Sequence, residues 1–229
     1  MKPALAWPTC LVIELRQYTL HPGQRDVLID LFEREFVETQ EAVGMHVLGQ
    51  FRDLDDPDRF VWLRGFPDMS ARADGLAAFY GGPVWQAHRD AANATMVDSD
   101  NVLLLRPATG GSGFALTDDA RAGIGSRPLH AGLVVATICP LAAQVVPDVV
   151  TFFERTVQPA LAAAGAPVAA CLVTENQPNN FPRLPVREGE SVVVGLAPRD
   201  IALPTRLVTQ LAGPPRLLRL QPTRRSPLT

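Results

Sequence analysis

The chain has 229 residues, enough for one large domain or two smaller ones. Of these residues 47% are hydrophobic and 20% are charged, and the net charge is −3, which is typical of a globular protein and excludes a strongly basic nucleic-acid binder or membrane-surface binder. No apolar run reaches the ~18–20 residues that span a bilayer, and residues 1–10 lack the apolar core of a signal peptide.

The first half predicts the order β-α-β-β-α-β. Its expected strands and helical segments are residues 10–20, 24–44, 45–53, 59–66, 67–80, 82–98 and 101–107. The helical spacing of apolar residues ends at Gly44, and a five-residue turn with Pro and Asp joins the second and third strands. Those two strands are therefore expected to form an antiparallel hairpin, and the half as a whole a ferredoxin-like unit.

The same order recurs after a glycine-rich linker that includes Thr109–Gly113. The triplet Phe32-Glu33-Arg34 has its counterpart Phe153-Glu154-Arg155 121 positions later, and Gly165 follows Gly44 at the same distance. We therefore predict two tandem ferredoxin-like units whose antiparallel sheets stack into an α+β barrel. Residues 1–107 form the first, 108–128 the linker, 129–223 a second, degenerate unit, and 224–229 a tail expected to fray.

Strand alternation separates polar from apolar side chains in the first unit. Leu11, Ile13 and Leu15 share the face expected to pack under helices. The opposite, polar face carries Glu14, Arg16, Tyr18, Gln50, Trp62 and Arg64. Because an unpaired buried charge is costly, we expect this polar face to line a partly wet barrel lumen, with Glu14 paired to Arg16 or Arg64. The alternative is a structural ion-pair ladder, or a subunit seam.

The second unit carries Val193 and Gly195 where the first carries Trp62 and Arg64, so we expect one site, served mainly by the first unit. Trp85 and His88 share one face of an expected helix. A lone helical histidine is more often a hydrogen-bonding surface or core residue than a catalytic one.

Cysteines and histidines give little sign of metal or redox chemistry. Cys10, Cys139 and Cys171 lie in apolar strands without CxxC spacing, which favours buried reduced thiols and a cytoplasmic protein over a catalytic thiol or metal site. There is no HExxH motif and no third ligand at metal spacing, so we expect no bound metal. Dinucleotide, P-loop and hydrolase motifs are also absent from the sequence.

Several segments of the first half resemble the NIPSNAP family of the dimeric α+β barrel superfamily. They are the strand-to-helix opening at residues 14–24, the aromatic hairpin strand at 60–72, the Trp-containing helix at 82–96 and the closing strand at 101–107. The resemblance implies a barrel formed within one chain or between chains, and often a dimer. The wider superfamily includes cofactor-free oxygenases, small lactone isomerases, haem enzymes and binding proteins.

Together these observations predict a cofactor-independent enzyme acting on a small aromatic or anionic metabolite. In this hypothesis Glu14, Arg64 and His88 are catalytic. The predicted substrate-binding residues are Arg16, Tyr18, Gln50, Trp62 and Trp85. The alternatives are a non-catalytic small-molecule binder or interaction module, and a haem enzyme using His88 or His130. We expect no nucleic acid, no membrane insertion and a homodimer.

Overall fold

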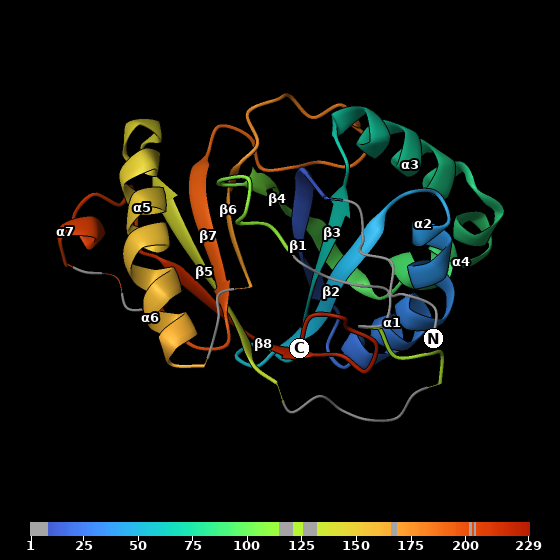
Figure 1. Cartoon of the computed structure of the whole chain (residues 1–229). Coiled ribbons are helices and arrows are strands. Elements are labelled where there is room, and N and C mark those ends of the chain that lie inside the picture. Colours follow the sequence, from blue (N-terminus) through green and yellow to red (C-terminus); the bar gives the residue numbers. More distant parts are fainter. Residues whose placement is uncertain (1–8, 115–120, 126–131, 166–168, 202, 204) are drawn as a thin grey trace, which may run out of the picture.

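Eight antiparallel strands form one closed barrel with helices packed on its outside (Figure 1). The computed structural model describes residues 9–114, 121–125, 132–165, 169–201, 203 and 205–229. The strand order around the barrel is β1-β3-β2-β8-β5-β7-β6-β4. Within these residues no helix is long and apolar enough to cross a bilayer.

The first half contributes four strands and the helices on one side of the barrel. Its elements are β1 (Val12–Leu20), α1 (Arg25–Leu31), a π-helical turn η1 (Phe32–Phe36), α2 (Val37–Glu41), β2 (His46–Asp53), β3 (Arg59–Phe66), α3 (Met69–Gly81), α4 (Pro83–Asn93) and β4 (Met96–Pro107). The predicted β2–β3 hairpin is confirmed. The predicted last helix was too long, because Met96 and Asp98 already pair with β1 and extend β4.

The second half contributes the other four strands. Its elements are β5 (Val134–Leu141), η3 (Ala143–Val145), α5 (Val146–Phe152), a second π-helical turn η4 (Phe153–Val157), α6 (Gln158–Ala163), β6 (Ala170–Thr174), β7 (Ser191–Ala197), α7 (Thr205–Val208) and β8 (Arg216–Pro222). The strands of the two halves follow the same order, β4-β1-β3-β2 in the first half and β8-β5-β7-β6 in the second. The halves join through the strand pairs β2–β8 and β4–β6.

The barrel lumen is filled by apolar side chains from all eight strands. Ile13 and Leu15 of β1 and Leu63 of β3 belong to this cluster, together with residues of β5 to β8. A second apolar cluster lies between β1–β4 and the helices α1–α4, and a third lies between the second half's strands and α5–α6. An eight-stranded barrel is just wide enough for its inward side chains to fill it.

The expected assignment of the two strand faces was therefore wrong. Ile13 and Leu15 point into the lumen, whereas Tyr18 and Trp62 belong to the layer beneath the helices. Glu14 and Arg16 alternate with the lumen residues of β1, so they too face the helices. Leu11 is 53% exposed and belongs to neither layer. The lumen has no room for a wet polar face, so the polar side chains occupy the sheet–helix layer.

The C-terminal tail is packed against the barrel, although the sequence predicted that it would fray. Arg225, Ser226 and Leu228 are buried, and Leu228 belongs to the lumen cluster. The Arg225 backbone N–H donates to Glu33 Oε1 over 3.0 Å, and its guanidinium pairs with Glu38. The tail therefore ties the lumen cluster to the helices of the first half.

Two of the three cysteines are buried thiols, as the sequence predicted, whereas Cys10 is only partly buried. Cys139 and Cys171 are buried, and none of the three cysteines forms a disulfide. Burial raises the pKa of Cys139 to about 11 and the pKa of Cys171 to about 12, so both thiols stay protonated at neutral pH. Among the described residues no group of His, Cys, Asp and Glu is arranged to hold a metal ion.

Candidate functional site

Three arginines converge on one carboxylate beneath the helices of the first half. Arg16 Nη1 and Arg64 Nε donate to Glu14 Oε2 over 2.7 and 2.8 Å, and Arg72 Nε donates to Glu14 Oε1 over 2.7 Å. Arg64 Nη2 also lies 2.7 Å from Oε2, without the alignment of a hydrogen bond. All four residues are at most 1% exposed.

Strand register brings the first three of these residues together. Glu14 of β1 lies directly opposite Arg64 of β3, and Arg16 lies opposite Trp62. Directly paired residues of an antiparallel sheet share a face and stand about 4.5–5.5 Å apart, within reach of an ion pair. Gln50 of β2 lies opposite Trp62 on its other side. One row across three strands therefore carries Arg16, Trp62 and Gln50.

Arg72 reaches the cluster from α3. The side chain of Asp68 caps this helix by accepting the Ala71 N–H over 2.8 Å. Arg72 then falls at helical spacing with Met69, Leu76 and Phe79, and all of these are buried. A charged residue at a core-facing helix position is the feature of the sequence that points to Arg72.

The cluster carries an excess of positive charge. Three guanidinium groups face one carboxylate, and arginine stays protonated in proteins. Burial alone would raise the pKa of Glu14, but the charges of Arg64, Arg16 and Arg72 outweigh burial and hold it well below its usual value. Glu14 is therefore ionised, and two buried positive charges remain uncompensated, which costs several kcal/mol per ion in the absence of a partner.

Several buried hydrogen-bonding groups beside this cluster have no partner. They include Arg72 Nη2 and Trp62 Nε1, both of which are donors. Both side-chain amide atoms of Gln50 are also without a partner, although the residue is completely buried. Most buried polar side-chain atoms in proteins are hydrogen-bonded, so unpaired donors next to surplus positive charge indicate a place for an acceptor, above all an anion.

An aromatic cavity of about 30 Å³ adjoins the arginines. Its walls are Tyr18, Leu28, Phe32, Phe36, Gln40, Trp62, Phe79, Tyr80, Trp85, Ala92 and Met96. The Arg64 guanidinium carbon lies 5.1 Å from the Trp62 ring centre and 5.9 Å from that of Tyr80, and Arg64 Nη1 lies 3.4 Å from Gln40 Oε1. The arginines thus stand directly behind the cavity wall.

Tyr18 links the arginines to this cavity. Its hydroxyl oxygen accepts from Arg16 Nε over 3.0 Å, which leaves its own proton free to be donated. Burial raises the pKa of Tyr18 more than the charge of Arg16 lowers it, so the phenol stays protonated at neutral pH. A ligand oxygen in the cavity would therefore meet a neutral donor backed by a cation.

The structure brings most of the predicted site residues together, although in a different layer from the one expected. Glu14, Arg16 and Arg64 form the cluster, Tyr18, Trp62 and Trp85 line the cavity, and Gln50 lies beside Trp62. His88 lies behind the cavity wall, with its ring centre 6.3 Å from that of the wall residue Phe36. Its Nε2 lies 3.6 Å from Glu35 Oε2 on a partly exposed stretch of α4, and it is not among the cavity walls. His130 lies outside the described residues.

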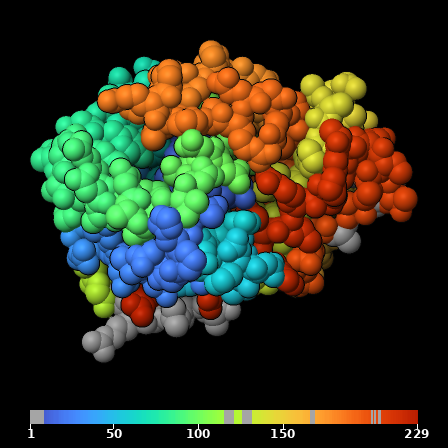
Figure 2. Space-filling model, turned by 180° about the vertical axis from the view of Figure 1, so that it is seen from behind, coloured from blue at the N-terminus to red at the C-terminus, as the bar shows by residue number. Residues whose placement is uncertain are grey.

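The second half supplies part of the site, which the sequence did not reveal. The loop of residues 175–190 between β6 and β7 runs over the barrel toward α3 (Figure 1) and lies beside the green surface of the first half in Figure 2. Arg72 Nη1 donates to Asn179 Oδ1 over 3.0 Å and to Asn180 Oδ1 over 2.7 Å. The Phe181 ring stacks on Tyr80, with 6.2 Å between ring centres.

Among the residues of the second half that the structure describes, the corresponding layer holds no such cluster. A Cβ atom on Gly195 would lie 2.3 Å from Phe153 Cζ, so this ring fills the space above β7. The surrounding cluster is apolar. The expectation of a single site built mainly on the first half stays a prediction.

Fold and site define an α+β barrel protein with a cationic, aromatic-walled cavity between sheet and helices. Residues 13–109 match the family model described as NIPSNAP. No curated protein matches the chain.

Two solved structures share the fold over nearly the whole chain. A proposed monooxygenase from Lactobacillus acidophilus NCFM superposes with a TM-score of 0.58 at 11% identity, over 95% of this chain and 98% of its own. A proposed monooxygenase from Fusobacterium nucleatum subsp. nucleatum gives a TM-score of 0.57 at 9% identity, over 95% and 94%. An uncharacterised NIPSNAP-like domain protein from Burkholderia xenovorans is 27% identical, with a TM-score of 0.42 over 47% and 92%. At such identities the first two establish the fold only.

Proposed function

We propose that this protein binds a small anionic aromatic compound between the sheet and the helices of its first half and stabilises negative charge on it during a reaction. The observation that supports this most directly is the buried cluster of three arginines on Glu14, with Arg72 Nη2 and Trp62 Nε1 left without acceptors. A ligand carboxylate or phenolate would supply both the missing negative charge and the missing acceptors.

The roles of the residues follow from their surroundings. Arg16 and Arg64 hold the anion or the charge that develops on it, Tyr18 donates to its oxygen, and Trp62 and Trp85 flank its ring. Glu14 is a poor general base, because the three arginines hold its pKa well below the usual value. It acts as the residue that positions the arginines. Its predicted catalytic role is therefore replaced by a positioning role.

The reaction that suits this site passes through an enolate or phenolate. Donors fixed in a dry site stabilise such a charge more strongly than water does. Isomerisation and oxygenation of an electron-rich ring both begin from this kind of anion, and the two full-length structural neighbours are named as proposed monooxygenases. The charge stabilisation in this proposal comes from protein side chains alone.

Calorimetric titration with salicylate and with salicylamide, its uncharged counterpart, tests the binding proposal. We expect salicylate to bind at least about tenfold more tightly, because charge-assisted hydrogen bonds are roughly twice as strong as neutral ones. Arg64→Met should remove this preference, whereas Arg89→Met, at an exposed arginine of α4, should leave it unchanged. Equal binding of the two compounds by the unmodified protein would contradict the proposal.

Oxygen uptake separates the enzyme from the non-catalytic binder. With 2,5-dihydroxybenzoate, an anionic hydroquinone that itself supplies the electrons to O₂, an oxygenase-like enzyme should consume oxygen faster than the uncatalysed reaction. Tyr18→Phe should lower that rate more than it weakens binding. Binding without turnover would favour the alternative of a small-molecule binding protein. Among the described residues His88 gives the haem alternative no support, since it lies off the cavity.

We also propose that the two halves are copies of one unit. The two π-helical turns, Phe32–Phe36 and Phe153–Val157, and the positive-φ residues Gly44 and Gly165 recur at one spacing. The homodimer and the cytoplasmic location stay predictions. Both halves close the barrel within one chain, so a second chain is not needed for closure.

A further inference from the structure

The loop of residues 175–190 covers the outer side of the arginine cluster and contacts Arg72. It is a long connection without helix or strand, and loops of this length are commonly functional. Most of its tip is exposed, yet it makes specific polar contacts with the first half. Arg72 Nη1 donates to both Asn179 and Asn180, and Asn180 Nδ2 donates to the Met69 carbonyl oxygen over 2.5 Å.

The contacts of this tip have the chemistry expected of the ligand. Two oxygen acceptors lie side by side on one guanidinium nitrogen, as two oxygens of an anion would. An aromatic ring, Phe181, follows at once and stacks on Tyr80 with an interplanar angle of 29°. Tyr80 is itself a wall of the aromatic cavity. However, the amide oxygens are uncharged and bind only Nη1, so they neither neutralise the cluster nor supply an acceptor for Arg72 Nη2.

The cavity as it stands is too small for an aromatic ligand. Its volume of about 30 Å³ has room for about one or two water molecules, whereas sites for small organic ligands measure roughly 300–1,000 Å³. All the walls of the cavity belong to strands and helices, which are packed into the core. The loop tip lies behind these walls: Phe181 stacks on the wall residue Tyr80, and Asn179 and Asn180 accept from Arg72.

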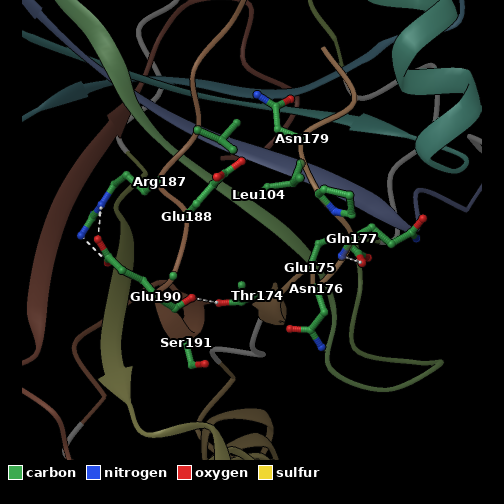
Figure 3. A pocket seen from close by; sticks show the side chains of 13 residues that line it. Leu104, Thr174, Glu175, Asn176, Gln177, Asn179, Arg187, Glu188, Glu190 and Ser191 are labelled. Carbon is green, nitrogen blue, oxygen red and sulfur yellow. Dashed lines mark hydrogen bonds and ion pairs between the residues drawn. The ribbon is translucent and has the colours of Figure 1, made fainter. Parts of the chain in front are cut away.

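The arms of the loop are anchored while its tip borders open space. The backbone N–H groups of Glu175 and Arg187 donate to β4, at Leu104 and Val102, and Arg187 is paired with Glu190. A hollow of about 380 Å³ lies between these arms, with Leu104 among its walls. Figure 3 shows Asn179 and the Arg187–Glu190 pair on different sides of this hollow. The tip can therefore shift without breaking its anchors.

We infer that Asn179, Asn180 and Phe181 form an internal plug that imitates the ligand and must be displaced by it. This inference rests on the proposed function and extends it. The ligand is an aromatic compound with two acceptor oxygens side by side, such as the two oxygens of a carboxylate attached to the ring. The second half thus regulates access to the site of the first. The apparent affinity is lowered by the fraction of molecules in which the plug is seated.

Salicylate titration of Asn179→Ala/Asn180→Ala tests the plug against a matched control, Asn176→Ala, at an exposed position of the same loop. The double variant should bind salicylate at least about fivefold more tightly, because ligand no longer competes with the two amide oxygens. Asn176→Ala should bind as the unmodified protein does. Unchanged or weaker binding by the double variant overturns the plug, since the loop would then be a lid that contacts the ligand.

Limited trypsin cleavage after Arg183, an exposed residue of the loop, gives a second readout that also detects misfolding. Salicylate should speed this cleavage if it displaces the tip, and slow it if the loop closes over the ligand. If neither the unmodified protein nor the double variant binds salicylate, the proposed function fails and the plug fails with it. If both bind it equally, only the plug is overturned.

Discussion

Glu14 and Arg72 lie 58 positions apart in the chain and form a fully buried ion pair of 2.7 Å. This pair joins α3 to the sheet and completes a cluster in which one carboxylate holds three arginines. A structural ion-pair ladder, the alternative raised by the sequence, would balance its charges. This cluster does not, and the imbalance is what gives it a binding chemistry.

The imbalance predicts unequal costs for removing its members. Glu14→Gln should lower the free energy of unfolding by about 3–5 kcal/mol, because it leaves three buried cations without an anion. Arg64→Met should cost less, since it removes a surplus charge and keeps most of the side-chain volume. Urea denaturation of both variants provides the comparison. Equal losses would indicate that Arg64 serves mainly the structure.

Stability should depend on pH through Glu14. Its pKa is lowered in the folded state from an ordinary value of 4.5, so its contribution is present above that value and is lost as pH falls toward the folded-state pKa. The free energy of unfolding should therefore decline below about pH 4.5. The difference between the unmodified protein and Glu14→Gln, followed by urea denaturation from pH 6 downward, isolates this residue. A difference that does not shrink on acidification would refute the linkage.

The lumen should behave as a core and not as a binding site. Leu63→Ala should cost about 2–5 kcal/mol, because it leaves a cavity among packed side chains. Leu217→Ala, at a leucine of β8 that is 46% exposed, is the matched control and should cost much less. Salicylate affinity measured on both proteins should stay unchanged. If Leu63→Ala alone markedly weakened salicylate binding, the binding site would lie in the lumen.

The filled layer of the second half makes Gly195 hard to replace. Gly195→Ala should cost about 1–3 kcal/mol, because its Cβ would lie 2.3 Å from Phe153 Cζ and 3.0 Å from Ile201 Cδ1. Gly81→Ala at the end of α3, where no atom lies within 4 Å of the new Cβ, should be neutral or slightly stabilising. The melting temperatures of the two variants, measured by thermal unfolding, test this difference in stability. A neutral Gly195→Ala would mean that Phe153 leaves room above β7.

Adjacent arginines in the tail give a further matched pair. Arg225 is buried, and its guanidinium contacts Glu38 and the Glu33 carbonyl oxygen, whereas Arg224 is exposed. Arg225→Ala should lower the free energy of unfolding by about 2–3 kcal/mol, as expected for lost charge-assisted hydrogen bonds. Arg224→Ala should change it little. Similar melting temperatures for the two variants would restore the expectation of a frayed tail.

The amino-acid sequence was sufficient for the order of elements and for the membership of each strand face. Side chains alternate along a strand with a period of two, so Glu14, Arg16 and Tyr18 necessarily share a face, as do Trp62 and Arg64. Apolar helical spacing located α1 and the helical turns that follow it. These are local properties, and neighbouring residues decide them.

Only the tertiary structure decided which face became the lumen and what completed the site. Alternation shows which side chains share a face of the sheet, but it does not show which of the two faces the helices cover. Closing eight strands left an interior that side chains fill, which moved the charges beneath the helices. Arg72, Asn179 and Asn180 joined Glu14 from a helix and from a loop of the other half, because contacts between distant segments depend on packing that no local pattern encodes.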